Sequence, residues 1–142
     1  MATLKKPLVA LLVAPDDGMR RDIVAGVKQI TIREGYREGY EVGRPVMLGC
    51  ETEPWCVLAN ITAVRHCALA EVTPEELEAD GFQDHDDMLE GMRRFYPEMT
   101  WDSAVTVIRW ENVRGKLVEE YRHRQAYWIK FPQIARRIFD RK

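Results

Sequence analysis

The sequence has no long apolar run and no obvious targeting segment. Its longest apolar stretch, residues 8–15, is far shorter than the roughly 20 residues that a membrane-spanning helix needs. Lys5 and Lys6 precede this stretch as in a signal peptide, but no small-residue cleavage site follows. The sequence therefore predicts a protein without a membrane span, and the cytoplasm is the expected location.

Cysteine is scarce and irregularly spaced. The three cysteines, Cys50, Cys56 and Cys67, are odd in number and form no CxxC pair. This pattern argues against a disulfide framework and against a zinc ribbon. Because free cysteine is usually interior, we expect small buried thiols on strands. No metal and no cofactor are predicted.

Acidic and basic residues are concentrated in different parts of the chain, although the net charge is only −2. Residues 71–102 hold eleven acidic residues against two arginines, whereas residues 110–142 hold nine Lys or Arg against four acids. A basic segment of this kind can bind a polyanion, and it is equally typical of solvated helices. Both interpretations of the C-terminal segment stay open.

The 142 residues, 46% of them hydrophobic, suit one globular domain of α+β class. Short strands without regular βαβ alternation favour a compact barrel. We expect strands near 8–13, 29–33, 45–48, 57–64 and 104–110, and helices near 19–27, 74–80 and 85–95. The expected core comprises Ile30, Ile32, Val57, Ile61, Val105 and Val107, and the second long helix carries the apolar stripe Met88, Leu89, Met92 and Phe95.

Local signals mark several element ends. Thr73 followed by Pro74 and Glu76 predicts a capping box, and Gly81 suits the end of that short helix. Asp84 is the expected cap of the next helix. Side chains alternate along a strand, so Gln29, Thr31 and Arg33 should share the face opposite Ile30 and Ile32.

Six segments resemble, in order, the signature elements of ASCH domains, a family with a PUA-like fold. They are the Gly26-Val27-Lys28 element running into Thr31-Ile32-Arg33, then Tyr40–Gly43, Ile61–Val64, Asp80-Gly81-Phe82, Phe95-Tyr96-Pro97 and Val105–Trp110. Arg44 departs from the pattern, since the family usually has an acid there. The resemblance covers roughly residues 19–111. It implies a small mixed β-barrel with flanking helices over residues 1–113. Residues 114–142 have no counterpart in it, and their apolar residues at helical spacing predict a basic helical extension.

Within this family the chain resembles, in its motifs, the small bacterial acetylcytidine amidohydrolases, which remove acetate from the exocyclic nitrogen of acetylated cytidine. The resemblance implies catalytic roles for Lys28, Thr31 and Asp80, although Asp80 is one methylene shorter than the family's glutamate. Glu78 is close enough in sequence to serve instead.

Amide hydrolysis needs a nucleophile, a base and donors for the oxyanion. Thr31 could attack, Lys28 could be the base if burial lowers its pKa, and Arg33 could hold a phosphate or the acyl oxygen. Lys28 is three residues before Thr31, so the two would face opposite ways on an unbroken strand. The scheme therefore requires Lys28 to lie where the helix turns into the strand.

Other interpretations remain open. Lys28 could be a solvated cation at a helix end, and Thr31 an ordinary strand residue. A second hypothesis is a non-catalytic RNA-binding module, or a ribonuclease, that uses basic and aromatic side chains. Its candidate residues are Arg33, Tyr36, Arg37, Tyr40 and Arg44, with Arg122, Arg124, Trp128 and Lys130 from the tail. A protein-interaction domain is a third class. The expected partner is RNA or a modified nucleoside, and the sequence does not predict an oligomeric state.

Overall fold

A computed structural model describes residues 9–13, 16–50 and 52–115 of the chain. Within them the elements follow as β1 (Val9–Val13), α1 (Asp17–Val24), β2 (Ile30–Glu34), β3 (Pro45–Cys50), β4 (Cys56–Ala68), a 3-10 turn (Leu69–Glu71), α2 (Pro74–Ala79), α3 (His85–Phe95) and β5 (Ala104–Arg114). This is the predicted order, with β4 and β5 longer than expected. The expected extension over residues 114–142 lies outside the described residues, apart from the end of β5 and Gly115.

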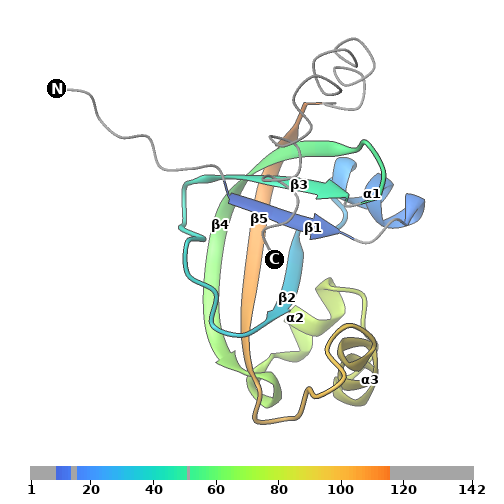
Figure 1. The fold of residues 1–142 in the computed structure, drawn as a ribbon, viewed down its shortest axis with the longest axis vertical. Coiled ribbons are helices and arrows are strands. Elements are labelled where there is room, and N and C mark those ends of the chain that lie inside the picture. Colours follow the sequence, from blue (N-terminus) through green and yellow to red (C-terminus); the bar gives the residue numbers. More distant parts are fainter. Residues whose placement is uncertain (1–8, 14–15, 51, 116–142) are drawn as a thin grey trace, which may run out of the picture.

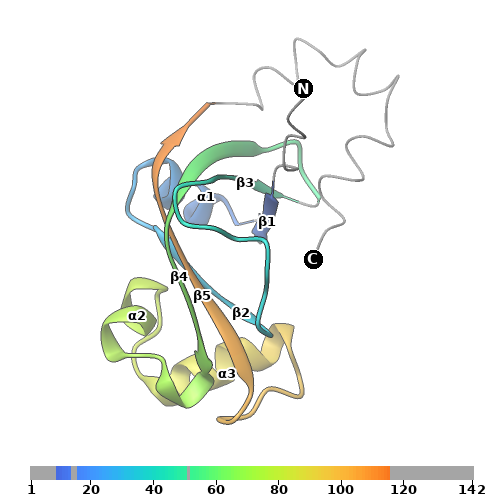
Figure 2. The same ribbon diagram turned by 90° about the vertical axis from the view of Figure 1, so that its left-hand side faces the viewer.

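The five strands form one sheet in the order β1-β3-β4-β5-β2. The β1–β3 pair is parallel and the other pairs are antiparallel. The long strands β4 and β5 run through the whole domain, with β1 and β3 crossing one end and α2 and α3 at the other (Figures 1 and 2). Register shifts within β4 help it to curve. The result is a mixed half-barrel, which confirms the predicted α+β class.

Side chains bridge the gap between the two edge strands, β1 and β2. The Arg33 guanidinium on β2 donates to the carbonyl of Leu12 on β1 at 2.6 Å. The Tyr40 hydroxyl, from the loop after β2, donates to the carbonyl of Ala10 at 2.9 Å. Edge strands leave backbone groups unpaired, so these two bonds satisfy part of β1 and hold the half-barrel nearly closed.

Apolar side chains fill both faces of the curved sheet. One cluster, including Leu11, Ile61 and Trp110, lies inside the half-barrel, and a second, including Ile30 and Met88, lies beneath α2 and α3. A small third cluster comprises Ala10, Met47 and Cys56. All six predicted core residues are buried: Ile30, Ile32, Val57, Ile61, Val105 and Val107. Because both faces of β2 are covered, Thr31 is buried as well.

Helix α1 ends earlier than the sequence predicts. Its N-cap is Asp16, whose carboxylate accepts from the Met19 amide at 3.1 Å. Gly26 has a φ of +76°, and the amides of residues 27 and 28 both donate to the carbonyl of Asp22. A left-handed glycine followed by such bonds terminates a helix. The prediction of a helix to residue 27 was therefore wrong, and Lys28 lies between the helix and β2.

The signals that begin α2 and α3 are confirmed. Thr73 and Glu76 form the predicted capping box, Gly81 has a φ of +102°, and Asp84 caps α3. The apolar stripe of α3 is only partly correct. Met88 and Met92 are buried, but Phe95, the last residue of α3, is 70% exposed.

The capping box gives a stability prediction. Replacing Thr73 by alanine removes the hydroxyl that accepts from the Glu76 amide at 3.1 Å. We expect the free energy of unfolding in urea to fall by about 1 kcal/mol. Thr100→Ala, at an exposed residue outside any helix, is the comparison. Equal losses in the two variants would contradict a capping role for Thr73.

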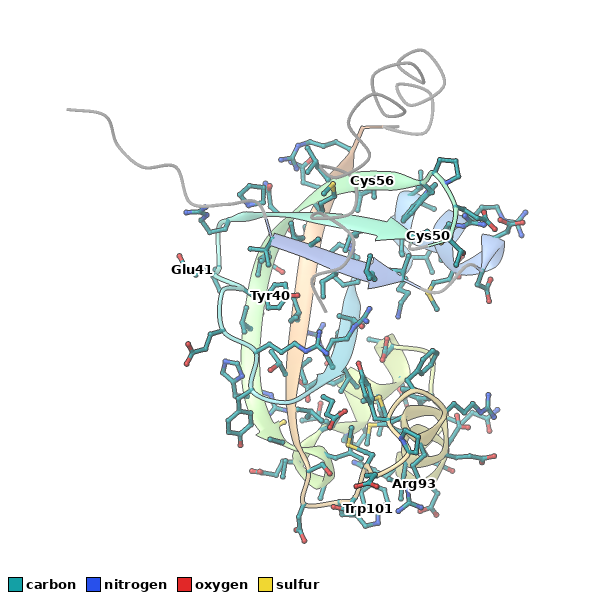
Figure 3. All side chains as sticks on the ribbon, in the orientation of Figure 1. Tyr40, Glu41, Cys50, Cys56, Arg93 and Trp101 are labelled. Carbon is teal, nitrogen blue, oxygen red and sulfur yellow. The ribbon has the colours of Figure 1, made fainter. Side chains whose placement is uncertain are left out.

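The three cysteines are the buried, unpaired strand thiols that the sequence predicts. Cys50 ends β3, and Cys56 and Cys67 lie on β4; Figure 3 shows Cys50 and Cys56 at the far end of the sheet from Arg93 and Trp101. Burial raises the pKa of the Cys56 thiol to about 12, which makes it a poor nucleophile. In the described ranges no three His, Cys, Asp or Glu side chains are placed to hold a metal ion. No helix there has the length and apolarity to cross a bilayer.

Candidate functional site

A cavity of about 610 Å³ lies where the edges of β1 and β2 face α3. Its polar lining includes Lys28, Thr31, Arg33, Arg37 and Asp80. Apolar side chains from β1, from the start of α1 and from α3 complete the wall, among them Leu11, Met19, Phe82, Met92 and Tyr96. A volume of this size is within the usual range for small-molecule sites.

Lys28 and Asp80 form a nearly buried ion pair in this cavity. Lys28 occupies the junction between α1 and β2, and Asp80 is the C-cap of α2, so the pair ties two distant parts of the chain together. The lysine side chain is 14% exposed and the aspartate side chain 10%. Lys28 therefore does not extend into open solvent, as a plain surface cation at a helix end would.

The environment of Asp80 shifts its proton affinity. Burial raises the pKa of the carboxyl above its ordinary value. The charge and hydrogen bond of Lys28, the charge of Arg33 and the backbone N–H of Ile32 act in the opposite direction without cancelling this effect. A carboxyl with a raised pKa beside an ammonium lets a proton pass between the two groups at a reduced cost.

The raised pKa gives a testable pH dependence. The folded state binds this proton more tightly than the unfolded chain does, so the stability contributed by protonated Asp80 is complete below pH 3.8 and is lost as pH rises through the raised pKa. Asp80→Asn cannot ionise. We expect the free energy of unfolding of the unmodified protein, measured in urea, to fall relative to that of Asp80→Asn as pH rises above 3.8. Glu78→Gln, at an exposed neighbour, is the control. A free energy of unfolding of the unmodified protein that rises relative to that of Asp80→Asn over this pH range would contradict the assignment.

Thr31 and Arg33 lie on the same face of β2, as strand alternation predicts. The Arg33 Nε donates to the Thr31 hydroxyl oxygen at 3.0 Å, while another guanidinium nitrogen holds Leu12. The threonine hydroxyl therefore accepts a charge-assisted hydrogen bond, and its own proton is free to be donated elsewhere. Such a donor stabilises negative charge that develops on the oxygen.

Several residues of the cavity were not predicted from the sequence. Phe82, Met92, Arg94, Phe95 and Tyr96 line it from α3 and the turn before α3. Gly91 provides room for the Phe82 ring, since a Cβ there would lie 2.5 Å from the ring atom Cε1. The indole of Trp110 also borders the cavity, and its N–H has no hydrogen-bond partner among the described residues. The signal available in the sequence was the Phe95-Tyr96-Pro97 element of the resemblance.

Other predicted site residues lie away from the cavity. Glu78 is exposed on α2, so Asp80 is the carboxylate that lines the cavity. Tyr36 is 59% exposed and its ring lies 5.3 Å from that of His66. Tyr40 packs against the half-barrel core and points toward β1, so its ring is not a free stacking surface (Figure 3). Arg44 pairs through its backbone with Glu41 and Ile61 and does not line the cavity.

The tail residues proposed for RNA binding lie outside the described part of the chain. They are Arg122, Arg124, Trp128 and Lys130. Of the predicted basic residues with a described position, Arg33 and Arg37 line the cavity. The predicted binding residues therefore form three groups: those at the cavity, those described away from it (Tyr36, Tyr40 and Arg44), and the tail residues, which stay a prediction.

Comparison with known proteins identifies the fold. No family model matches the sequence, and no curated protein matches it significantly. Among solved structures, an ASCH domain from Lactobacillus crispatus superposes with a TM-score of 0.56 at 17% identity, over 73% of this chain and 78% of that one.

Two further structures agree with this match. A serine-to-alanine mutant of the ASCH protein from Zymomonas mobilis gives a TM-score of 0.51 at 10% identity, over 74% of this chain and 66% of that one. A protein from Enterococcus faecalis gives 0.51 at 16% identity, over 80% of this chain and 84% of that one. Identities this low relate the folds alone. The chain therefore has the fold of the ASCH domains, as its sequence resemblance predicts.

Proposed function

We propose that this protein hydrolyses the amide of an N-acylated cytidine, with Thr31 as nucleophile and the Lys28–Asp80 pair as the proton-handling group. The observation that supports the proposal is the meeting of these three side chains, with Arg33, on one cavity. Side chains from two segments far apart in the sequence, residues 28–33 and residue 80, converge there. Purely structural roles for Lys28 and Thr31 would not require them to share a cavity with a buried carboxylate.

The pair supplies a base without a net change in charge. Transfer of a proton from the Lys28 ammonium to Asp80 leaves a neutral amine beside a neutral acid, with no net change of charge in the cavity. The raised pKa of Asp80 favours this transfer. The Lys28 amine then accepts the hydroxyl proton of Thr31 as the oxygen attacks. This replaces the simpler expectation of a lysine deprotonated by burial alone.

The bonds change in two steps. In the first, a bond forms between Thr31 Oγ and the acyl carbon, the bond from that carbon to the exocyclic nitrogen breaks, and Lys28 returns the proton to the leaving nitrogen. In the second, water hydrolyses the acyl ester, which releases the carboxylic acid and restores the Thr31 hydroxyl. The guanidinium of Arg33, hydrogen-bonded to Thr31 Oγ, stabilises the charge on that oxygen as its proton leaves.

The apolar wall suits a nucleobase. Phe82, in the turn before α3, and Tyr96, at the end of α3, line the cavity with aromatic rings. Met92 of α3 lines it as well. Bases are commonly held against aromatic side chains in sites of this kind. Acylated cytidine provides a planar apolar face together with the amide that the polar group would cleave.

The proposal is tested by incubating the protein with N-acetylcytidine and measuring cytidine by chromatography. The expected result is cytidine release by the unmodified protein and none by Lys28→Ala, provided that the variant remains folded. If the unmodified protein releases no cytidine, the proposal is wrong.

A non-catalytic RNA-binding role is the second candidate, and a ribonuclease is its variant. Two arginines on the cavity, Arg37 and Arg94, and the exposed Tyr36 ring favour it. Binding of an unmodified RNA with no loss of acetyl groups from an acetylated one would support this role over hydrolysis.

A further inference from the structure

The charge lining the cavity is strongly positive. Four basic side chains and one acidic side chain line it, a formal net charge of +3 on a chain whose net charge is −2. The basic residues are Lys28, Arg33, Arg37 and Arg94, and the acidic one is Asp80. A neutral nucleoside gains little from such an excess, whereas an anionic ligand is attracted and held by it.

The two inner cations already have partners. Lys28 is paired with Asp80, and Arg33 is bonded to Thr31 and to the carbonyl of Leu12. Asp80 also interacts electrostatically with Arg33, so its negative charge offsets part of the positive charge of Arg33. The unbalanced positive charge therefore belongs mainly to Arg37 and Arg94.

Arg37 is held in place with most of its donors unused. Its backbone N–H donates to the Thr106 hydroxyl at 2.8 Å, and its Nε donates to the carbonyl of Glu34 at 3.0 Å. Thr106 is fully buried and is itself anchored to the carbonyl of Gly35 at 2.7 Å. Among the described residues the two terminal nitrogens of Arg37 have no partner. An arginine fixed in this way binds an anion with little further loss of side-chain entropy.

Arg94 has only a weak competing partner. It lies in the last turn of α3, and its nearest carboxylate in the described structure is Glu90 at 3.8 Å. Both side chains are about three-quarters exposed (74% and 75%). Exposed pairs of this geometry contribute little, so Arg94 can turn toward a ligand at small cost.

We infer that Arg37 and Arg94 bind a phosphate group, so that this site prefers a phosphorylated cytidine to the free nucleoside. The inference rests on the proposed function for the identity of the base. A phosphate carries a charge of about −1.5 to −2 and accepts paired hydrogen bonds from guanidinium groups. The group belongs either to a nucleoside monophosphate or to the backbone of an RNA strand.

The test is calorimetric binding of cytidine 5′-monophosphate and of cytidine, which does not depend on turnover. We expect the monophosphate to bind at least about tenfold more tightly at low salt, since each hydrogen bond to a charged group contributes about that factor. Arg37→Gln and Arg94→Gln should each remove most of this advantage. Arg21→Gln, at an exposed residue of α1 away from the cavity, should retain it.

Equal binding of the two ligands, or an advantage that survives both substitutions, would overturn the inference. A cytidine-containing oligonucleotide identifies the source of the phosphate: tighter binding than the monophosphate indicates an RNA strand, and exclusion indicates a free nucleotide. Absence of N-acetylcytidine hydrolysis would disprove the proposed function alone, because the preference for the phosphorylated ligand is measured independently.

Discussion

Replacing Thr31 by valine should abolish deacetylation of N-acetylcytidine while the protein stays folded. Valine matches the shape and strand preference of threonine but has no hydroxyl to attack the amide. We expect kcat/KM to fall by at least about 10³-fold, equivalent to about 4 kcal/mol of transition-state stabilisation. The loss of one charge-assisted hydrogen bond with Arg33 should cost about 2 kcal/mol of folding free energy, well below the loss of transition-state stabilisation.

Thr62→Val is the matched control, because Thr62 lies on β4 with an exposed side chain and does not line the cavity. Its kcat/KM should equal that of the unmodified protein. Retention of activity in Thr31→Val would exclude Thr31 as the nucleophile. Equal loss in both variants would indicate a general effect on the fold.

Removing one member of the Lys28–Asp80 pair should lower the free energy of unfolding by about 3 kcal/mol at neutral pH. Lys28→Met leaves the Asp80 carboxylate buried without its cation. Asp80→Leu leaves the Lys28 ammonium buried without its carboxylate. The cost is high because both side chains are nearly buried, with 14% and 10% exposure. Urea denaturation of each variant measures it. The loss in Lys28→Met should shrink as pH falls, since Asp80 then takes up a proton.

The double variant Lys28→Met/Asp80→Leu distinguishes a buried pair from two independent residues. Two apolar side chains leave no isolated charge, so the double variant should be more stable than either single variant, yet inactive. Single and double substitutions of the exposed pair Arg94–Glu90 should give additive changes in the free energy of unfolding. Additive losses at Lys28 and Asp80 would mean that the ion pair does not contribute to folding.

Local signals in the sequence predicted much of the scaffold. The alternation around Ile30 and Ile32 predicted β2 and the shared face of Thr31 and Arg33, because the direction of a strand side chain follows from its position alone. The capping residues Thr73 and Asp84 predicted the starts of α2 and α3, because a cap accepts from amides within one turn of the helix. Both kinds of signal depend on neighbours in sequence.

The walls of the cavity depend on tertiary contacts, and the sequence predicted them less well. Phe95 continues the apolar stripe of α3, but it is 70% exposed, because burial depends on tertiary packing that the stripe alone does not determine. The resemblance pointed to Asp80, with Glu78 as its substitute, and the structure places Asp80, at the end of α2, on the cavity and Glu78 on the exposed surface. Tyr40 was a plausible stacking residue until its hydroxyl was found to bond β1.

The most direct test of the central claim is one reaction with an RNA strand that contains a single N-acetylcytidine, resolved by liquid chromatography and mass spectrometry. Amide hydrolysis at the cavity of Lys28, Thr31 and Asp80 predicts a strand lighter by one acetyl group, with its backbone intact. The same protein should convert free N-acetylcytidine to cytidine. Shortened strands, or both substrates recovered unchanged, would contradict the account.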